Sequence, residues 1–336
     1  MRKNILGVGI VGAGLIGTRR ARIIQTTGNG RVVVVADTDS ARAAEFAQKY
    51  GCERAKNWKE LAKRSDIEVV IIAVPNKFIK PIAIAAFKNG KHVFSEKPLG
   101  RNVAEAEAIV KAAKKYRRLL KVGFNHRFHP AIFTAKKLFD EGRIGRILFI
   151  RGRYGHGGRL GMEKEWRFQK DISGGGELLD QGVHLIDLMR WFAGEFKEVY
   201  GITDTKFWNT KLDDNAFAIL RNKKITASLH VSTTNWKNVF SFEIFGDKGF
   251  LTIDGLGRSY GEETLIIGKR KPEFGVPEIE VFKFSEDPSW EDEWKNFIGA
   301  LTQRKKLIGD GFDGWEANRI VGAIYESSKR KKVVKL

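Results

Sequence analysis

Hydrophobic residues follow two different rhythms along this chain, and the change falls near residue 125. Before that point, short runs rich in Val and Ile alternate with segments whose apolar residues recur at helical spacing. Strands are predicted at Ile5–Val11, Val32–Ala36, Val69–Val74, His92–Ser95 and Leu119–Phe124, and helices at Ile16–Thr26, Ser40–Tyr50, Ile79–Lys88 and Val103–Tyr116. This alternation predicts an α/β fold in which a doubly wound parallel sheet has helices on both faces.

The second half of the chain is dominated by strands. A predicted helix at Pro130–Glu141, a strand at Ile147–Tyr154, a basic loop and a helix at Glu177–Phe192 come first. Strands then follow at Glu198–Thr205, Asn215–Leu220, Ile225–Ser232, Val239–Phe245, Phe250–Ile253 and Ile279–Phe284, and helices at Trp290–Thr302 and Trp315–Lys329. Short turns between successive strands predict an antiparallel sheet.

A chain of 336 residues is too long for one typical core, so we expect two domains. The expected domains are residues 1–125 and residues 126–336. The C-terminal helix could also pack against the first domain. The composition, 42% hydrophobic and 30% charged, is that of an ordinary globular protein. Because Cys52 is the only cysteine, no intrachain disulfide or cysteine metal cluster can form, which favours a reducing, cytoplasmic compartment and no metal.

The formal net charge of +20 raises the question of an acidic partner. The basic residues are scattered and no nucleic-acid-binding motif accompanies them, so we expect a lysine-rich surface and no nucleic acid. Nucleic-acid binding is the rival interpretation, and it predicts steeply salt-dependent binding to unrelated DNA. No segment approaches the ~20 apolar residues of a membrane span. Gly7, Gly9 and Gly12 interrupt the apolar start, which favours a buried strand over a signal peptide.

A glycine-rich turn follows the first predicted strand and opens the first predicted helix, with the sequence Gly12-Ala13-Gly14-Leu15-Ile16-Gly17. In such a turn the first glycine permits the sharp bend, the second lets a pyrophosphate approach the backbone, and the third lets helix and strand pack closely. The helix N-terminus offers amide hydrogens to the phosphates. These features predict a Rossmann dinucleotide-binding domain.

Asp37 ends the second predicted strand, 20 residues after Gly17. A carboxylate at that place accepts hydrogen bonds from the ribose hydroxyls of adenosine and repels a 2′-phosphate, so we expect NAD as the cofactor. Arg42 follows closely and could hold a phosphate, which leaves NADP open.

Two further segments end predicted strands of the same sheet, where ligands of doubly wound folds bind. Pro75 and Asn76 follow one strand, and Ser95-Glu96-Lys97-Pro98 ends the next. Both are expected at the nicotinamide end of the crevice. A Lys97 ammonium placed there would hydrogen-bond a reacting oxygen and stabilise the negative charge that develops on it. Taken alone, Lys97 is explained as well by a surface charge.

The segment GGGELLDQGVHLIDL, residues 174–188, places Asp180 and His184 four residues apart on a predicted helix, where their side chains are neighbours. A carboxylate beside an imidazole fixes its tautomer and supports the cation that forms when the ring accepts a proton. Gly182 between them leaves room for a ligand. A solvated Asp–His pair is the alternative, but the many apolar neighbours indicate a buried helix.

Three motifs together resemble the Gfo/Idh/MocA family, which includes glucose–fructose oxidoreductase and inositol dehydrogenase. They are GAGLIG at 12–17, SEKPLG at 95–100 and LLDQGVHLIDL at 178–188. The resemblance spans nearly the whole chain and implies an N-terminal Rossmann domain and a C-terminal α/β domain with a large open, mostly antiparallel sheet. It also implies hydride transfer between a nicotinamide cofactor and a hydroxyl-bearing carbon of a sugar, polyol or sugar nucleotide, in a homodimer or homotetramer.

The resemblance implies a catalytic set at matching positions, which comprises Lys97, Asp180 and His184. In the expected reaction His184 removes the hydroxyl proton as hydride leaves the same carbon, Asp180 orients His184, and Lys97 binds the oxygen. By the same resemblance, Glu96 shapes the lysine's loop beside the cofactor. Asn125 and Arg127, in the segment GFNHRFHP, are implied to lie near the nicotinamide and the substrate.

The substrate itself is less defined by the sequence. Arg167 and Trp166 belong to a basic stretch, residues 151–170, that suits a phosphate or nucleotide-linked sugar, although a solvated loop explains it equally well. Tyr154 is expected to touch substrate or to pack within its strand. Two alternatives remain to a NAD-dependent dehydrogenase, namely an NADP-dependent carbonyl reductase on the same scaffold and a NAD-binding regulator without turnover.

Overall fold

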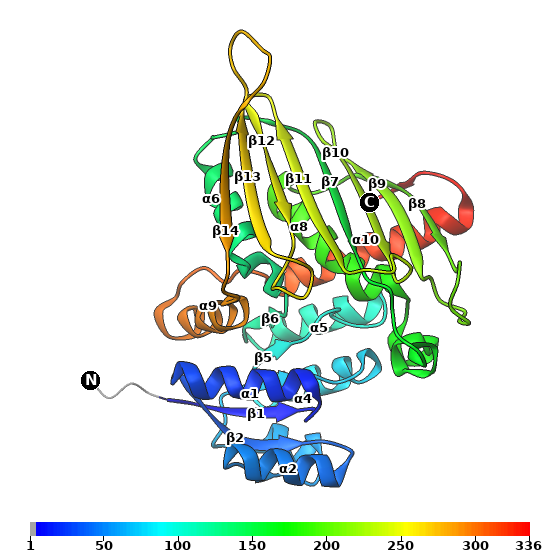
Figure 1. Cartoon of the computed structure of the whole chain (residues 1–336). Coiled ribbons are helices and arrows are strands. Elements are labelled where there is room, and N and C mark those ends of the chain that lie inside the picture. Colours follow the sequence, from blue (N-terminus) through cyan, green and yellow to red (C-terminus); the bar gives the residue numbers. More distant parts are fainter. Residues whose placement is uncertain (1–4) are drawn as a thin grey trace. The chain divides into compact units, whose positions relative to one another are not determined.

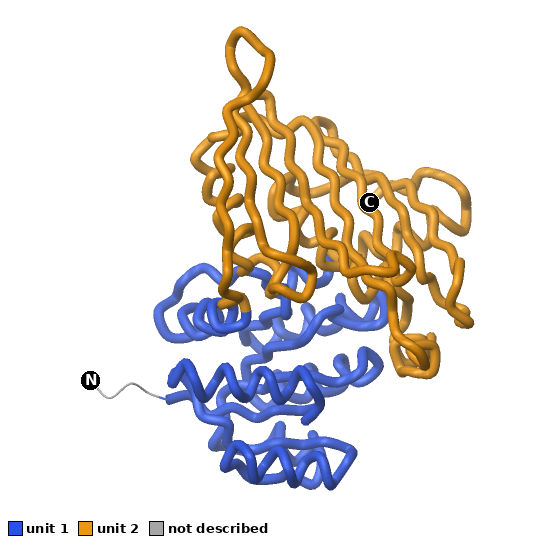
Figure 2. The backbone as a smooth tube through the Cα atoms, in the orientation of Figure 1, with its two compact units in different colours: residues 1–124, 290–316 blue, residues 125–289, 317–336 orange. Residues whose placement is uncertain are grey.

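The structure, a computed structural model that describes residues 5–336, divides into two compact units (Figure 2). The first unit contains the residues up to 124 and residues 290–316. The second contains residues 125–289 and 317–336. Residues 290–316 therefore belong to the first unit although they follow the sheet of the second unit in the chain.

The first unit is built on a six-stranded parallel sheet with the strand order β3-β2-β1-β4-β5-β6 (Figure 1). Its strands are β1 Leu6–Val11, β2 Gly30–Ala36, β3 Glu53–Arg54, β4 Val69–Ile72, β5 His92–Ser95 and β6 Leu120–Val122. Its helical segments are α1 Leu15–Thr27, α2 Ser40–Tyr50, α3 Trp58–Lys63, η1 Asn76–Phe78, α4 Ile79–Lys88, α5 Val103–Lys115 and α9 Ser289–Gln303. The residues of β4 are fully buried, as an apolar run between two helical layers should be. The predicted doubly wound fold is confirmed.

The second unit is built on a nine-stranded sheet with the order β14-β13-β12-β11-β7-β10-β9-β8-β15. Its strands are β7 Ile147–Gly155, β8 Glu198–Asp204, β9 Asn215–Arg221, β10 Thr226–Ser232, β11 Val239–Gly246, β12 Gly249–Asp254, β13 Glu263–Lys269, β14 Glu278–Phe284 and β15 Val334–Lys335. Neighbouring strands are antiparallel except β7 and β10, which pair in parallel. The parallel pair arises because β7, the first strand of this unit, is inserted between β10 and β11.

Helices cover one face of the nine-stranded sheet (Figure 1). They are α6 Pro130–Asp140, α8 Val183–Ala193 and the second part of α10 Gly311–Arg330. The unit also contains five shorter helical segments, which are η2 Asn125–Phe128, η3 Met162–Lys164, η4 Trp166–Phe168, α7 Lys170–Ser173 and η5 Leu178–Gly182. Gly152 of β7 lies against Leu185 of α8, and Gly201 of β8 against Ile324 of α10. Of residues 5–336, none lie in a helix long and apolar enough to cross a membrane.

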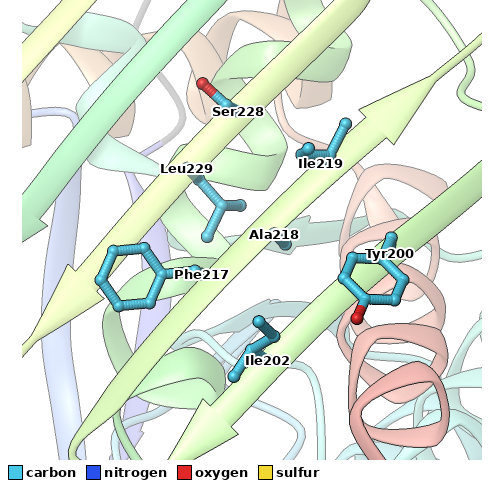
Figure 3. Close-up of a pocket in the computed structure, with 7 residues that line it drawn as sticks. All are labelled: Tyr200, Ile202, Phe217, Ala218, Ile219, Ser228 and Leu229. Carbon is cyan, nitrogen blue, oxygen red and sulfur yellow. The ribbon is translucent and has the colours of Figure 1, made fainter. Parts of the chain in front are cut away.

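The opposite face of the sheet carries exposed apolar side chains. Along β9 the exposed residues alternate with buried ones, so that Phe217 and Ile219 point outward and are 50% and 45% exposed. Together with Tyr200 and Ile202 of β8 they line an open hollow on this face (Figure 3). We call these four residues the β8–β9 patch.

The helix predicted at Glu177–Phe192 differs from the observed one. The structure has a π-helical turn at Leu178–Gly182, and α8 begins only at Val183. A π-helical turn is wider than an α-helical one, so the i, i+4 geometry assumed for Asp180 and His184 does not carry over unchanged. The pattern also missed the strands β3, β13 and β15 and the helix α3.

Candidate active site

The turn between β1 and α1 has the shape that a dinucleotide fingerprint requires. Gly12 has a φ of +102° and donates its amide to the carbonyl of Ala36 at 2.8 Å. A Cβ on Gly17 would lie 1.8 Å from the carbonyl oxygen of Gly12, so only glycine lets the helix come this close. A Cβ on Gly14, in contrast, would meet nothing within 4 Å. The backbone at Gly14 therefore faces open space at the N-terminus of α1, where a pyrophosphate fits.

Leu15 and Ile16 are the first two residues of α1. The Leu15 side chain is 76% exposed, and Ile16 is half-buried. Neither side chain carries a polar group. Their contribution to a nucleotide site is therefore made by the backbone amides of the first helical turn, which have no partner within the helix.

Asp37 stands just beyond β2 and ties the glycine turn to it. Its Oδ2 accepts the amide of Ala13 at 2.7 Å, and its Oδ1 accepts the amide of Asp39 at 2.9 Å and Nη2 of Arg42 at 2.8 Å. Burial tends to raise the pKa of Asp37, but these hydrogen bonds and the charge of Arg42 outweigh it, so that the pKa lies below its ordinary value. Asp37 is therefore an oriented, ionised carboxylate at the position expected for a ribose ligand.

Lys97 follows β5 in a segment that a chain of ion pairs anchors. Glu96 pairs with Arg20 of α1 at 2.7 Å, Arg20 pairs with Glu293 of α9 at 2.8 Å, and Glu293 pairs with Lys121 of β6 at 2.9 Å. Glu96 is 13% exposed, and the other three side chains of the chain are at most 1% exposed. Lys97 itself is half-buried. Glu96, expected beside the cofactor, is thus held by the helix that carries the glycine turn.

Pro75 and Asn76 lie where β4 ends. Pro75 precedes the short helix η1, and Asn76 within it is 5% exposed. Because β1, β4 and β5 are parallel neighbours, their carboxyl ends lie at one edge of the sheet. That edge gathers the glycine turn, Asn76 and Lys97.

In the second unit, a buried aspartate holds the segment before α8. Asp213 accepts the amides of Gly176 at 3.0 Å and Leu178 at 2.7 Å, and the hydroxyl of Tyr325 donates to it at 2.7 Å. A Cβ on Gly176 would lie 2.1 Å from the carbonyl oxygen of Asp213, so this close approach requires glycine. Burial raises the pKa of Asp213. The π-helical turn that carries Asp180 begins at Leu178, one of the residues whose amide Asp213 binds.

His184 lies in the first turn of α8, stacked on a second histidine. The rings of His184 and His126 have centroids 3.7 Å apart and planes inclined by 15°. Both are buried, at 3% and 5% exposed. The Tyr154 ring stands edge-on to His184, with centroids 6.3 Å apart, and is tilted by 60° against His126, with centroids 5.2 Å apart. The predicted base therefore sits in a cluster of rings, of which sequence reasoning had singled out only Tyr154.

Tyr154 is fully buried and shares a hydrogen bond between hydroxyls with Tyr260. Burial raises the pKa of both phenols, that of Tyr260 to about 12, and the neighbouring charges of Glu177 and Asp180 raise them further. Both hydroxyls are therefore neutral at physiological pH, and the proton of one of them is engaged in the hydrogen bond between the two. Asp180 and Glu177 are near enough for their charges to act on both phenols.

Arg167 lies at the edge of this cluster. Its Nε is 3.4 Å from Oδ2 of Asp180, and its guanidinium lies over the ring of Trp166 at 4.6 Å. His156 follows directly after β7. Burial lowers the pKa of its imidazole, although the charge of Asp180 opposes this shift. The structure thus brings Asp180, Tyr154, His184 and Arg167 into one region of the second unit.

Asn125 and Arg127 are placed by the short helix η2. Arg127 forms two hydrogen bonds with Asp187 of α8, at 2.7 and 2.6 Å, and both side chains are buried. Nδ2 of Asn125 donates to Ser289 Oγ at 3.4 Å, and its Oδ1 lies 3.3 Å from Nδ1 of His126. Arg127 therefore fixes η2 to α8, and Asn125 contacts a ring of the histidine stack.

Sequence reasoning missed several residues of this site. His126 and His129 lie in the segment GFNHRFHP, from which only Asn125 and Arg127 had been selected as site residues. The two histidines in the same segment were a signal that could have pointed to them. Nδ1 of His129 lies 3.0 Å from Glu263. Tyr260 and Asp213 sit in connecting loops that show no periodic pattern. Among the residues that the structure describes, no group of His, Cys, Asp and Glu side chains is arranged to hold a metal ion.

Comparison with known proteins identifies the class of both units. Residues 6–124 match the oxidoreductase family with an NAD-binding Rossmann fold. Residues 132–252 match the GFO/IDH/MocA C-terminal domain. The chain belongs to the Gfo/Idh/MocA family of NAD-binding oxidoreductases, as the three motifs predicted.

Two of the similar proteins are named as a sugar dehydrogenase and a polyol dehydrogenase. The levoglucosan dehydrogenase of Pseudarthrobacter phenanthrenivorans is 41% identical over 175 residues, a match that covers 51% of this chain and 45% of that protein. The myo-inositol 2-dehydrogenase of Thermotoga maritima is 27% identical over 341 residues, which cover 98% of each chain. The relative with the higher identity is thus matched over less than half of its length.

Solved structures share the fold over the whole chain. A levoglucosan dehydrogenase in complex with NADH and levoglucosan has a TM-score of 0.91 at 27% identity, and the match covers 99% of both chains. The same enzyme in complex with NADH and L-sorbose has a TM-score of 0.89 at 27% identity, with 98% of both chains covered. These neighbours bind NADH on the same architecture.

Proposed function

We propose that this protein is an NAD-dependent dehydrogenase that acts on a hydroxyl-bearing carbon of a sugar or polyol. The observation that carries the proposal is the buried ring cluster around His184, with Asp180 and Arg167 beside it. Such a cluster excludes water around an imidazole, and it surrounds that imidazole with neutral hydroxyl donors. These are conditions for a proton to be moved at a bound alcohol.

The roles of the residues follow from their chemistry. The nicotinamide supplies a hydride acceptor when it is bound. We assign to His184 the removal of the hydroxyl proton, to Asp180 the orientation of the substrate or of His184, and to Lys97 a hydrogen bond to the reacting oxygen. The neutral hydroxyls of Tyr154 and Tyr260 suit recognition of further substrate hydroxyls. In carbonyl reduction the same groups act in reverse, with His184 as the acid.

The nucleotide turn supports NAD as the cofactor. Gly14 faces open space, and Asp37 is an ionised carboxylate at the ribose position. Arg42, which could hold a 2′-phosphate, is already engaged by Asp37 at 2.8 Å. A bound NADP would have to break that pair and would meet the charge of Asp37, so NADP is the weaker candidate.

The substrate we propose is uncharged. The arginines of the basic stretch 151–170 are largely engaged by carboxylates. Arg151 pairs with Glu243 at 3.0 Å, and Arg159 pairs with Glu165 at 2.5 Å. Arg167 is shared between Asp180 and Glu165. Guanidinium groups compensated in this way favour a neutral polyol over a phosphorylated or nucleotide-linked sugar. The sugar and inositol substrates named for the relatives support the same class.

We also propose that the protein is a cytoplasmic homodimer or homotetramer. The open sheet face with its β8–β9 patch supports association, because exposed apolar surface of this kind is a common contact between subunits. The single cysteine suits a reducing compartment.

The test of the proposed reaction is a pair of variants, Lys97→Met and His184→Asn. Both should retain NADH binding, measured by fluorescence titration, and lose about 10²- to 10⁴-fold in kcat, because each removes one group that acts on the alcohol. His230→Asn is the matched control, because His230 lies on β10 with its ring stacked on Phe217. Wild-type turnover in either test variant would refute its role.

The substrate class is tested by NAD reduction rates with inositols, free and anhydro aldoses, sugar phosphates and nucleotide sugars. We expect turnover with one of the uncharged groups. Side-by-side titrations with NAD and NADP should show tighter binding of NAD. Turnover confined to phosphorylated sugars would contradict the argument from the paired arginines.

A further inference from the structure

Two exposed aromatic side chains meet in the loops of the second unit. Phe207 lies in the loop between β8 and β9, and Trp236 lies in the loop between β10 and β11. Their side chains are 61% and 62% exposed. The rings stand edge to face, with centroids 4.7 Å apart and planes inclined by 80°. We call Phe207 and Trp236 the aromatic platform.

We propose that the aromatic platform is a second sugar-binding subsite. In this proposal it holds the neighbouring ring of a neutral disaccharide, while the first ring of the same molecule lies beside Asp180 and His184. The inference rests on the proposed function, in which the first ring is oxidised there. It adds that the preferred substrate is larger than a single sugar ring.

The loop that carries Phe207 is fixed by a buried carboxylate. Oxygens of the fully buried Asp214 accept three successive backbone amides, which are those of Lys206, Phe207 and Trp208 at 2.8, 2.8 and 3.0 Å. Burial tends to raise the pKa of Asp214, but the hydrogen bonds that it accepts outweigh this and hold the pKa below its ordinary value. The ring of Phe207 is therefore placed in advance, which lowers the entropy lost when a ligand binds.

The loop that carries Trp236 is also fixed, and its backbone is strained. Trp236 has a φ of +55°, a conformation that bulky side chains rarely adopt. The turn before it is held by hydrogen bonds, because the amide of Thr234 donates to Ser232 Oγ at 2.8 Å and the amide of Asn235 donates to the carbonyl of His156 at 3.2 Å. Strain that keeps a large apolar ring in solvent points to a binding role for that ring.

The aromatic platform is continuous with the region around Asp180. A Cβ on Gly157 would lie 3.0 Å from Cα of Trp236, so the two loops are in close contact. Gly157 follows His156, whose pKa is lowered mainly by burial and is also influenced by the charges of Asp180 and Arg167. Arg167 in turn lies 3.4 Å from Asp180. A ligand that extends from Asp180 past His156 would therefore reach the platform.

The chemistry of the platform suits a sugar ring. A pyranose presents C–H groups on its faces, and these carry a small positive charge that is attracted to the negative face of an aromatic ring. The platform offers such faces without a charged group of its own. Next to it, the half-buried side chain of Asn235 carries an amide and a carbonyl, which match the hydroxyls at the edge of a sugar.

The charged groups near the platform favour a neutral ligand. Lys206 pairs with Asp204 at 3.0 Å, and Arg159 pairs with Glu165 at 2.5 Å. Lys237 is exposed, so water and salt screen its charge. A phosphate or a nucleotide would therefore find little uncompensated positive charge here, whereas an uncharged ring requires none.

The test measures the binding of monosaccharides and disaccharides to the NADH-bound protein by isothermal titration calorimetry. The probes are glucose and galactose, compared with cellobiose, maltose and lactose. At least one disaccharide should bind about 3- to 10-fold more tightly than its monosaccharides. Phe207→Ala and Trp236→Ala should each reduce this difference, and Trp236→Phe should keep most of it. None of these variants should change the affinity for the monosaccharides by more than about twofold.

Phe274→Ala is the matched control. Phe274 is also an exposed aromatic residue with a positive φ, at 68% exposed and +65°, but it lies in the loop between β13 and β14. This variant should leave every sugar affinity unchanged. Disaccharides that bind no more tightly than monosaccharides, or that bind equally well to the wild type and both alanine variants, would overturn the proposal.

Two further outcomes separate this proposal from its alternatives. If Trp236→Ala lowers the sedimentation coefficient and leaves sugar binding unchanged, the platform is a contact between subunits and the sugar subsite is refuted. If the alanine variants lose the preference for a disaccharide while the wild type reduces NAD with none of the sugars, the subsite stands and the proposed function fails.

Discussion

His92 shows how strongly surroundings set the chemistry of one side chain. It lies at the start of β5, where its Nδ1 accepts the amide of Leu119 at 3.0 Å. Burial, assisted by the charge of Arg118, lowers its pKa to about 4. The same residue type serves in this chain as a structural acceptor at His92 and as a buried stacked ring at His184.

The lowered pKa of His92 predicts a pH dependence of stability. The unfolded state, with an ordinary histidine pKa near 6.5, binds the proton more tightly, so folding free energy is lost as the pH falls from about 6.5 towards 4. Allowing for partial exposure, we expect a loss of about 1 kcal/mol between pH 7 and pH 5 from this group. Urea unfolding at the two pH values should show that His92→Asn, which keeps an acceptor, removes this part of the loss.

Some single residues could be predicted from the sequence and others could not. Asp37 was predicted as a ribose ligand because its spacing from Gly17 is typical of a dinucleotide-binding βαβ unit. Tyr260 was not, because it reaches the site from a loop with no periodic pattern, through a hydrogen bond to Tyr154. A partner that depends on long-range packing leaves no local signal in the sequence.

Between elements, the ion-pair chain of the first unit joins segments that are far apart in the sequence. Arg20 projects from α1, Glu96 follows β5, and Glu293 comes from α9. The guanidinium of Arg20 also lies 4.2 Å from the ring of Phe94 and 4.3 Å from that of Trp290. The helix that carries the glycine turn is therefore joined directly to the segment that carries Lys97.

Removal of Arg20 should destabilise the protein strongly. In Arg20→Met, Glu96 and Glu293 each lose the Arg20 guanidinium, while Glu293 remains paired with Lys121. We therefore expect a loss of about 3 kcal/mol or more in the free energy of unfolding. The neighbouring Arg19→Met is the control, because Arg19 contacts Trp290 from a less buried position. Equal unfolding midpoints in urea for the two variants would show that the chain contributes little.

Elements with a strong local pattern were predicted closely. The helices α2 Ser40–Tyr50 and α4 Ile79–Lys88 and the strand β5 His92–Ser95 have the bounds expected from their apolar spacing. The π-helical turn before α8 was not foreseen, because the apolar spacing of this segment is that of an α-helix. Asp213, 35 residues further along the chain from Leu178, accepts the amides at the start of this turn, and such a long-range contact leaves no local signal in the sequence.

At the scale of the whole molecule, the open sheet face is the feature with consequences for assembly. Its apolar side chains are regularly spaced, because alternate residues of β8 and β9 point the same way. Phe217 is 50% exposed, and Ile202 is 45% exposed. A face of this kind is covered in most proteins that carry one.

The proposed association should depend on this patch. Phe217→Lys combined with Ile219→Glu places two charges in the contact, so we expect dissociation to a smaller species in sedimentation-velocity experiments with the fold retained. Phe274→Lys is the control, because Phe274 is 68% exposed in the loop between β13 and β14. An unchanged sedimentation coefficient in the double variant would place the subunit contact elsewhere.

The return of residues 290–316 to the first unit also determines how this protein can be dissected. A fragment that stops at residue 124 would lack Glu293, so Arg20 and Lys121 would each keep a buried charge with no counterion from α9. Trp294 and Phe297, which pack in the same core, would be missing as well. A stand-alone nucleotide-binding fragment would therefore need 290–316 joined on by a new linker, and truncation libraries cut between the two stretches should yield insoluble products.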